Sequence, residues 1–270
     1  MEIRTDDVIV RFDKSTEKTA KDVVSLYPAI RTELVKAIGW RIDFRPVVII
    51  SRGREIFERM SAGDLVIAFA LPEENIILLD NSKISPQPLV LRSVMKHESC
   101  HLLLHAHVAE ENLPRWLDEG VCQWASGGFA EILSENKDIL AGASVSGKLT
   151  SMRELSTFPK DGQGLLLAYE ESKSLIEYVV SEYGTSGLLR ILGSLKGGEA
   201  TETAFKKSLG VTVSELENQW ADNLRRKYTR FYYISRRIYL ILFSVAALIT
   251  IYGFIKMMQR KRSYVDEEND

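Results

Sequence analysis

This chain has few cysteines, little net charge and no apolar run in its first residues. Each of these features argues against a class of protein. The 270 residues include only two cysteines, and neither has a partner at short spacing, which argues against a zinc site built from cysteines. The formal net charge is −2, which argues against a surface dedicated to nucleic acid. Residues 1–7 include acidic side chains and no apolar run, so no signal peptide is visible.

Histidine is also scarce, but its distribution is informative. All four histidines lie between positions 97 and 107, and two of them frame a glutamate in the sequence His97-Glu98-Ser99-Cys100-His101. Residues i and i+4 lie one above the other on a helix, so His97 and His101 can present imidazole nitrogens to one ion. Glu98 points beside that ion, where it is placed to take a proton from metal-bound water. The spacing therefore predicts a metal-binding helix that carries its own base.

A segment downstream provides a candidate third ligand. Residues 113–120 read LPRWLDEG, with seventeen residues between His101 and Glu119. Catalytic zinc sites have three protein ligands and one open position, and two histidines with a glutamate is one standard set. Pro114 suits the first turn of a helix, which would carry Glu119 inward beside the histidine helix. The sequence predicts Zn2+ held by His97, His101 and Glu119.

In these residues the chain resembles the gluzincins, in particular the bacterial peptidase-MA-like metallohydrolases. Those proteins share the zinc-binding helix and a Trp-Leu-x-Glu-Gly segment that supplies the third ligand, here at 116–120. The resemblance runs from about Val8 to the 220s and is specific from His97 to Gly128. It implies a zinc metallopeptidase of α+β class, with a zincin-like catalytic domain in which a small mixed sheet lies beside the zinc helix. By analogy, an exposed strand there would pair with an extended peptide substrate.

His107 offers an alternative third ligand, because metzincins carry a histidine six residues past the second ligand. That arrangement needs a glycine midway, where this chain has Leu104. On an unbroken helix His107 would lie about 240° around from His101, so Glu119 is the better candidate. His105, one turn past His101, is interpreted as a residue at the rim of the site or hydrogen-bonded to a ligand.

The ligand set predicts a mechanism. Zinc lowers the pKa of its bound water to about 7 and polarises a carbonyl, and Glu98 would act as general base and then deliver the proton to the leaving amine. Gluzincin aminopeptidases place an oxyanion-binding tyrosine at the start of a comparable helix, and the Ala-Tyr-x-x-Ser pattern around Tyr169 is similar. The alternative is a core tyrosine, since Tyr169, Ile176 and Val180 have helical spacing. Both roles stay open here.

Four further residues lie near the motif. Asp118 and Gln123 could orient metal ligands through hydrogen bonds, although an ordinary polar position is the preferred interpretation of Asp118. Cys100 and Cys122 each follow a proposed ligand by three residues. If the two helices pack side by side, both thiols could face the seam between them, and we expect them to be buried and free.

The remaining segments predict an α/β lobe followed by a helical one. Strands are expected at 8–12, 47–51, 65–71 and 76–80, the last two as a hairpin around the turn at 72–75. A helix is expected from Ser15 or Thr16 to Gly39. Further helices are expected at 165–183, 186–195 and 213–227. Residues 134–164 have few apolar anchors and are expected to form a loop, either a mobile segment over the cleft or a plain surface loop.

The C-terminus carries a candidate membrane anchor. Residues 238–255 contain no charge, and eighteen residues at about 1.5 Å each span about 27 Å, close to the hydrocarbon thickness of a bilayer. The alternative, a buried helix of the soluble domain, is disfavoured because the segment is uncharged on every face. We expect a peptidase domain at 1–230, a transmembrane helix at 238–255 and a short charged tail at 256–270.

The sequence leaves alternatives open for the membrane side of the catalytic domain and for the function. The catalytic domain is cytoplasmic if Met1 is the true start, and extracytoplasmic if an upstream signal is missing, since the positive residues on the two sides of the anchor are too balanced to decide. In function, the alternatives to a peptidase acting on peptides or proteins are an inactive zinc-binding membrane scaffold, or an adaptor in which the His-Glu-x-x-His motif is coincidental.

Overall fold

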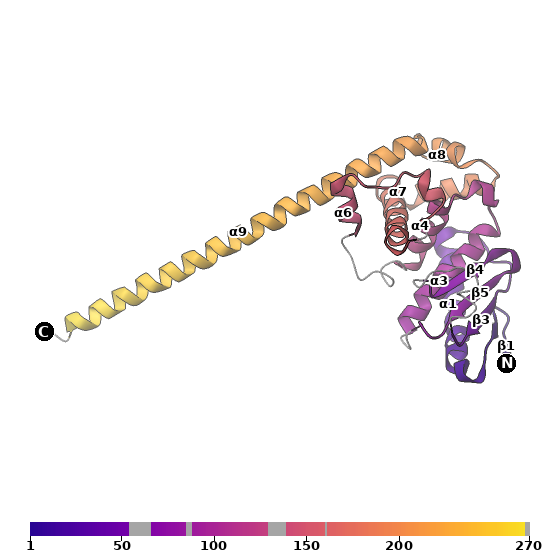
Figure 1. Cartoon of the computed structure of the whole chain (residues 1–270), viewed down its shortest axis with the longest axis horizontal. Coiled ribbons are helices and arrows are strands. Elements are labelled where there is room, and N and C mark those ends of the chain that lie inside the picture. The colour runs from indigo at the N-terminus through magenta and orange to yellow at the C-terminus, as the bar shows by residue number, and fades with distance from the viewer. Residues whose placement is uncertain (54–65, 85–87, 129–138, 160, 268–270) are drawn as a thin grey trace. The chain divides into compact units, whose positions relative to one another are not determined.

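The computed structural model describes residues 1–53, 66–84, 88–128, 139–159 and 161–267 (Figure 1). The chain divides into two units, Met1–Ala221 and Asp222–Asp270. Its class is mixed α+β, mostly helical, with one small sheet among the described residues.

Five short strands form a mixed sheet in the order β1-β2-β3-β5-β4. The inner strands β2, β3 and β5 are parallel, and the outer strands β1 and β4 pair antiparallel with their neighbours. The strands are β1 (Glu2–Arg4), β2 (Ile9–Arg11), β3 (Val47–Ser51), β4 (Ala68–Leu71) and β5 (Ile76–Asp80). A small mixed sheet is therefore confirmed. β1 was not predicted, because three residues are too few to show alternation.

The predicted hairpin is confirmed, and it puts β4 at the edge of the sheet. β4 and β5 pair from Ala68 opposite Leu79 to Leu71 opposite Ile76. The connection is a 3₁₀ turn, η2 (Pro72–Glu74), closed by Asn75, which adopts a left-handed φ of 54° and donates its N–H to the carbonyl of Pro72. Asparagine tolerates this conformation better than most residues. The hairpin therefore leaves β4 beside α3 (Pro88–His105) rather than beside another strand.

The parallel pairing of β2 with β3 requires a crossover, and α1 (Glu17–Ile38) provides it. Its buried residues recur at helical spacing and pack toward α3 and β2. The helix ends where Gly39 adopts a left-handed φ of 79° and donates its N–H to the carbonyl of Val35. The predicted helix ending at Gly39 is confirmed. Its buried side chains are Ala20, Val23, Tyr27, Ile30, Leu34 and Ile38.

Helices make up the second part of the first unit. α4 (Arg115–Ser126) packs against both α3 and α7 (Gly162–Lys196). The predicted break near residue 184 is confirmed, because Gly184 inside α7 has a non-helical φ of 71°. α8 (Thr201–Leu209) follows, and the long helix α9 (Val213–Glu267) comes after it.

The expectation of a loop at 134–164 is wrong for part of that segment. Residues 139–146 form α6 (Ile139–Ser146), and η4 (Glu154–Ser156) follows. The helix is anchored by the buried side chains of Leu140 and Ala143, which the overall polarity of the segment concealed. Residues 134–138 and 160 lie outside the described residues.

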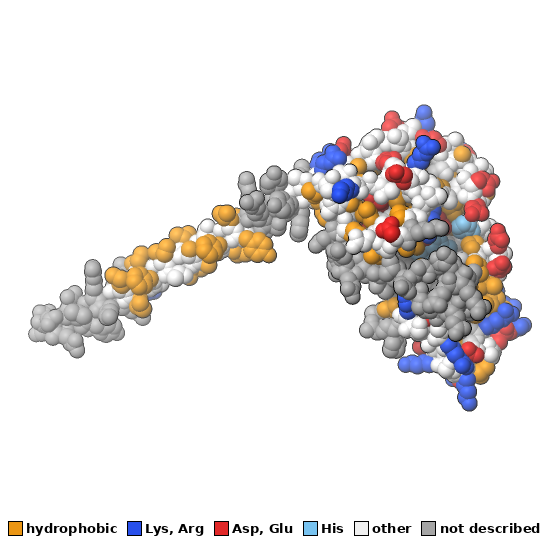
Figure 2. Space-filling model, in the orientation of Figure 1, with side chains coloured by type: hydrophobic (Ala, Val, Ile, Leu, Met, Phe, Trp, Pro, Cys, Tyr) orange, Lys and Arg blue, Asp and Glu red, His pale blue; other side chains and the backbone are white. Residues whose placement is uncertain are grey.

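The C-terminal part of α9 is long and apolar enough to cross a membrane. The candidate span is Tyr239–Met258, with a mean hydropathy of 2.1 and none of it buried. Figure 2 shows apolar side chains along this helix. The structure therefore does not support the alternative of a buried core helix.

Candidate metal centre

α3 brings His97 and His101 to one point. The two residues lie one turn apart, and their Nε2 atoms are 3.0 Å from each other. Both side chains are buried. Two imidazole nitrogens this close together in a buried position form the start of a cation site, because each can offer a lone pair when neutral.

α4 adds a carboxylate to this pair. Oε2 of Glu119 lies 3.4 Å from Nε2 of His97 and 3.5 Å from Nε2 of His101. The ligand atoms of the three residues all lie within 4.8 Å of one another. Oε2 of Glu119 is buried and has no hydrogen-bond partner among the described residues, which is costly unless a cation binds there. The donor set thus fits a zinc ion.

Asp118 fixes the orientation of His101. Its Oδ1 lies 2.9 Å from Nδ1 of His101, and its Oδ2 lies 3.0 Å from Nε2 of His105. A hydrogen bond at Nδ1 sets the tautomer that leaves Nε2 of His101 available to a metal. The interpretation of Asp118 as an ordinary polar position is therefore wrong, because its carboxylate is shared between His101 and His105.

The pKa values of these groups reflect the same contacts. Burial alone would raise the pKa of Asp118, but the charge of His101, together with the hydrogen bonds from His101 and His105, outweighs burial and lowers that pKa. Burial opposes a charge on His101 as well, and the carboxylates of Asp118 and Glu119 nevertheless raise its pKa well above the usual value. Against burial, the two imidazoles lower the pKa of Glu119. The imidazoles therefore favour the ionised form of both carboxylates.

Glu98 lies buried beside the cluster. Burial raises the pKa of its carboxyl, although the neighbouring His97 and His101 and a hydrogen bond from the main chain of Ala70 in β4 favour the charged form. A buried carboxyl beside the cluster is in a position to accept a proton and to release it again. The bond to Ala70 also ties the edge strand to the motif helix.

Tyr169, about two turns into α7, reaches the cluster. Its hydroxyl donates to Oε1 of Glu119 over 3.4 Å, and its ring packs edge-on against Phe158 with 5.2 Å between the ring centroids. Burial, together with the charge of Glu119, raises the pKa of this phenol well above 10. The side chain is therefore a neutral hydrogen-bond donor near the cluster, which is more than a core position requires.

A disulfide joins the two helices that carry the three clustered residues. The sulfurs of Cys100 in α3 and Cys122 in α4 are bonded, and both side chains are buried. The two side chains do meet at the seam between α3 and α4, but the expectation of free thiols is wrong. A disulfide here restrains the distance between the histidines and Glu119.

Gly120 allows α4 to approach α7. A Cβ atom at this position would lie 2.5 Å from the carbonyl oxygen of Ser172 and 2.7 Å from Cγ1 of Ile176, so no larger residue fits. Nearby, Nε2 of Gln123 donates to the carbonyl of Tyr169 over 3.1 Å. Gln123 therefore connects two helices and does not contact the clustered imidazoles through any described hydrogen bond.

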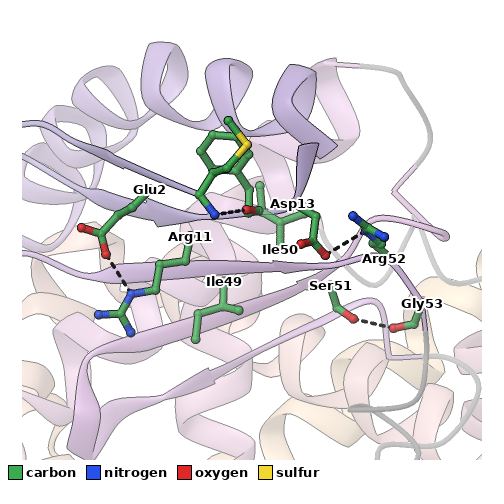
Figure 3. A pocket seen from close by; sticks show the side chains of 10 residues that line it. Glu2, Arg11, Asp13, Ile49, Ile50, Ser51, Arg52 and Gly53 are labelled. Carbon is green, nitrogen blue, oxygen red and sulfur yellow. Dashed lines mark hydrogen bonds and ion pairs between the residues drawn. The ribbon is translucent and has the colours of Figure 1, made fainter. Parts of the chain in front are cut away.

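His107 and the cavity at β2 and β3 both lie outside the cluster of His97, His101 and Glu119. His107 lies past the end of α3 with its ring 5.1 Å from that of Trp40, which agrees with its exclusion as a ligand. A cavity of about 890 Å³ lies at β2 and β3 and contains none of the clustered residues (Figure 3). Its two arginines, Arg11 and Arg52, pair with Glu2 and Asp13.

Sequence comparison identifies the family. The family model of the Peptidase MA superfamily matches residues 53–226, more than half of the chain. The chain belongs to the Peptidase MA superfamily. This match confirms the gluzincin-like resemblance inferred from the motif.

One solved structure similar to this Peptidase MA chain is a mutant of the M1 zinc metallopeptidase from Deinococcus radiodurans. The two share 14% identity with a TM-score of 0.44, over 82% of this chain and 50% of the other. This chain therefore spans about half the length of that protein. No curated protein matches the sequence.

Sequence reasoning gave too little weight to the contact of Asp118 with the histidines, and it missed the contacts of Arg115 and Ala70. The spacing of His101, His105 and Asp118 contained a signal, because two histidines one turn apart can share one carboxylate from a neighbouring helix. Arg115 precedes Glu119 by four residues and so shares its helix face. Ala70 acts through its main chain, which no side-chain pattern can reveal.

Proposed function

We propose that this member of the Peptidase MA superfamily is a zinc-dependent peptidase tethered to a membrane by its C-terminal helix. The observation that carries the proposal is the convergence of Oε2 of Glu119 with both Nε2 atoms of His97 and His101, at a buried point beside Glu98. Family membership supports hydrolysis as the reaction class. Residues 1–230 would form the peptidase domain, 238–255 the membrane helix and 256–270 a charged tail.

His97, His101 and Glu119 would hold the zinc ion. When bound, zinc acidifies water and polarises a substrate carbonyl. Glu98 takes the proton from the attacking water and later passes it to the leaving amine, a role usually worth about 10²–10⁴-fold in rate. Asp118 keeps Nε2 of His101 directed at the ion.

Tyr169 supplies a hydrogen bond to the oxyanion that forms during attack. Its phenol is neutral at physiological pH because burial raises its pKa, and its hydroxyl lies 3.4 Å from Oε1 of Glu119. One such donor is worth about 3–4 kcal/mol of transition-state stabilisation.

The substrate would be an extended peptide added to β4. This strand is at the edge of the sheet, and its Ala70 main chain contacts Glu98. Main-chain pairing with an edge strand tolerates many side chains, so a peptide bound there would bring its backbone close to the general base.

The test is metal analysis and peptide hydrolysis on the full-length protein in detergent. We expect Glu98→Gln to keep zinc and lose about 10²–10⁴-fold in turnover, and Glu119→Ala to lose zinc. Glu111→Gln, an exposed carboxylate in η3 (Glu110–Asn112), is the matched control and should change neither. Full activity in both site variants would refute the mechanism, and zinc binding without any hydrolysis would indicate an inactive scaffold instead.

Membrane tethering has a separate test. The full chain should fractionate with membranes and resist extraction by high salt and alkali. A chain ending at residue 230 should be released into the soluble fraction. If the full chain were extracted by alkali alone, Tyr239–Met258 would not be a membrane helix.

A further inference from the structure

The guanidinium of Arg115 lies at the solvent-facing side of the cluster. Arg115 is the first residue of α4, and its Nε is 3.8 Å from Oε1 of Glu119. Its side chain is 46% exposed, whereas that of Glu119 is 10% exposed and that of His97 is 3% exposed. Arg115 is therefore a charged group that both touches the cluster and meets solvent.

The ring of Phe158 supports this guanidinium. Its Cζ lies 4.5 Å from the centroid of the Phe158 ring, and Phe158 packs edge-on against Tyr169. One N–H of the guanidinium reaches the Tyr169 hydroxyl, and a guanidinium has five N–H donors, so further donors can bind a carboxylate. Phe158 is buried, so this support does not depend on a mobile surface group.

The contact with Glu119 does not explain why Arg115 is held at this position. The 3.8 Å separation is longer than a hydrogen bond, and the other carboxylate oxygen of Glu119 faces the two imidazoles. If Glu119 binds a metal ion, its negative charge is shared with that ion. A fixed arginine beside a bound cation then gains most from an anion that arrives with the substrate.

We propose that Arg115 binds a carboxylate of the substrate, next to the scissile bond. This inference rests on the proposed peptidase function and adds a substrate class to it. Oε1 of Glu119 is approached by both Arg115, at 3.8 Å, and the hydroxyl of Tyr169, at 3.4 Å. A carboxylate held by Arg115 therefore lies close to the bond that Tyr169 would assist. It is either the side chain of Asp or Glu or a free C-terminus.

The experiment compares matched peptides on the full-length, zinc-loaded protein in detergent. One series places Asp or Asn at each position beside the cleaved bond, and a second carries a C-terminal acid or amide. We expect the acidic member of one series to be cleaved about tenfold to a hundredfold more efficiently in kcat/KM, which is the worth of a hydrogen bond to a charged group. The series that shows the preference identifies the source of the carboxylate.

Variants then assign the preference to Arg115. Arg115→Gln should abolish the preference by lowering kcat/KM for the acidic peptide more than for the neutral one, and Arg115→Lys should restore part of it because a lysine keeps the charge without the planar fork. Arg153→Gln, at an exposed arginine before η4, is the matched control. Zinc content is measured for every variant, so that loss of metal is not mistaken for loss of recognition.

The outcomes separate this inference from the proposed function. An equal loss on acidic and neutral peptides in Arg115→Gln would mean that Arg115 only positions Glu119, and would overturn the inference. Glu98-dependent cleavage without an acidic preference would overturn it alone. If no peptide is cleaved, equilibrium binding of the acid and amide peptides to the same protein decides: binding that favours the acid and is lost in Arg115→Gln supports the inference, and equal binding overturns it.

Discussion

The disulfide between Cys100 and Cys122 should make a large contribution to the stability of the metal centre. The perturbation is the double substitution Cys100→Ala with Cys122→Ala, compared with the wild-type protein in its oxidised and reduced forms. The bond closes a loop of 22 residues that contains the end of α3 and the start of α4. Breaking it lets the unfolded chain explore more conformations and removes a restraint between the histidines and Glu119.

The loop length sets the expected magnitude. The chain-entropy relation for a closed loop of 22 residues gives about 3 kcal/mol of stabilisation. For a domain of this size, 1 kcal/mol corresponds to about 2–4 °C in Tm, so reduction should lower Tm by roughly 6–12 °C. The double variant should unfold at a still lower temperature, because two buried sulfurs are also removed from the packing between the helices.

The assay is urea and thermal unfolding of the full-length protein in detergent, with a metal chelator present so that zinc does not mask the effect. A thiol count on the denatured, unreduced protein accompanies it and should find no free thiol. The reduced wild type separates the bond from the packing, since its side chains are unchanged apart from the added hydrogens. Equal unfolding of the oxidised and reduced proteins, or two free thiols in the unreduced protein, would refute the reasoning.

Three further changes test other contacts. Gly120→Ala should destabilise the protein by about 1–3 kcal/mol in urea unfolding because its Cβ meets the backbone of α7. The control Gly193→Ala, where nothing lies within 4 Å of the new Cβ, should be neutral or stabilising. Equal effects of the two substitutions would contradict the close approach of α4 to α7. Asp118→Asn should weaken zinc binding by about 10–100-fold in chelator competition, and unchanged affinity would show that Asp118 does not orient His101. Burial raises the pKa of Glu171 to about 7, above its value in the unfolded chain. Between about pH 4.5 and 7 the folded protein therefore binds one more proton at Glu171 than the unfolded chain does. The free energy of unfolding consequently falls as pH rises through that window. Glu171→Gln should remove this decline and stabilise the protein at pH 8 by up to about 3 kcal/mol, and an unaltered profile of unfolding against pH would rule the group out.

The parts of this protein that follow from local periodicity could be predicted from its sequence. The pairing of His97 with His101 depends only on the helical repeat, and the hairpin of β4 and β5 depends on the turn residues between two apolar runs. The helix that ends at Gly39 follows from the spacing of its apolar residues and from the conformational freedom of glycine. These features need no knowledge of what lies across the core.

The parts that were missed depend on which segments meet in space. The sequence offered Asp118 either as a support for a ligand or as an ordinary polar position, and the choice depends on α4 placing it beside Nδ1 of His101. The bond between Cys100 and Cys122 requires the helices to pack at one particular offset. α6 was hidden because its eight residues, which include a glycine and two serines, are too few to show helical periodicity. Long-range contacts of this kind leave little trace in spacing along the chain.

α4 is connected independently to each of its two neighbours. It is bonded to α3 through a disulfide and through Asp118, and it is held to α7 through the crossing at Gly120 and the bond from Gln123. The segments that link these helices along the chain are therefore not needed to keep them in register. Insertions or deletions in those links would therefore alter what surrounds the cluster of His97, His101 and Glu119 more than the distances within it.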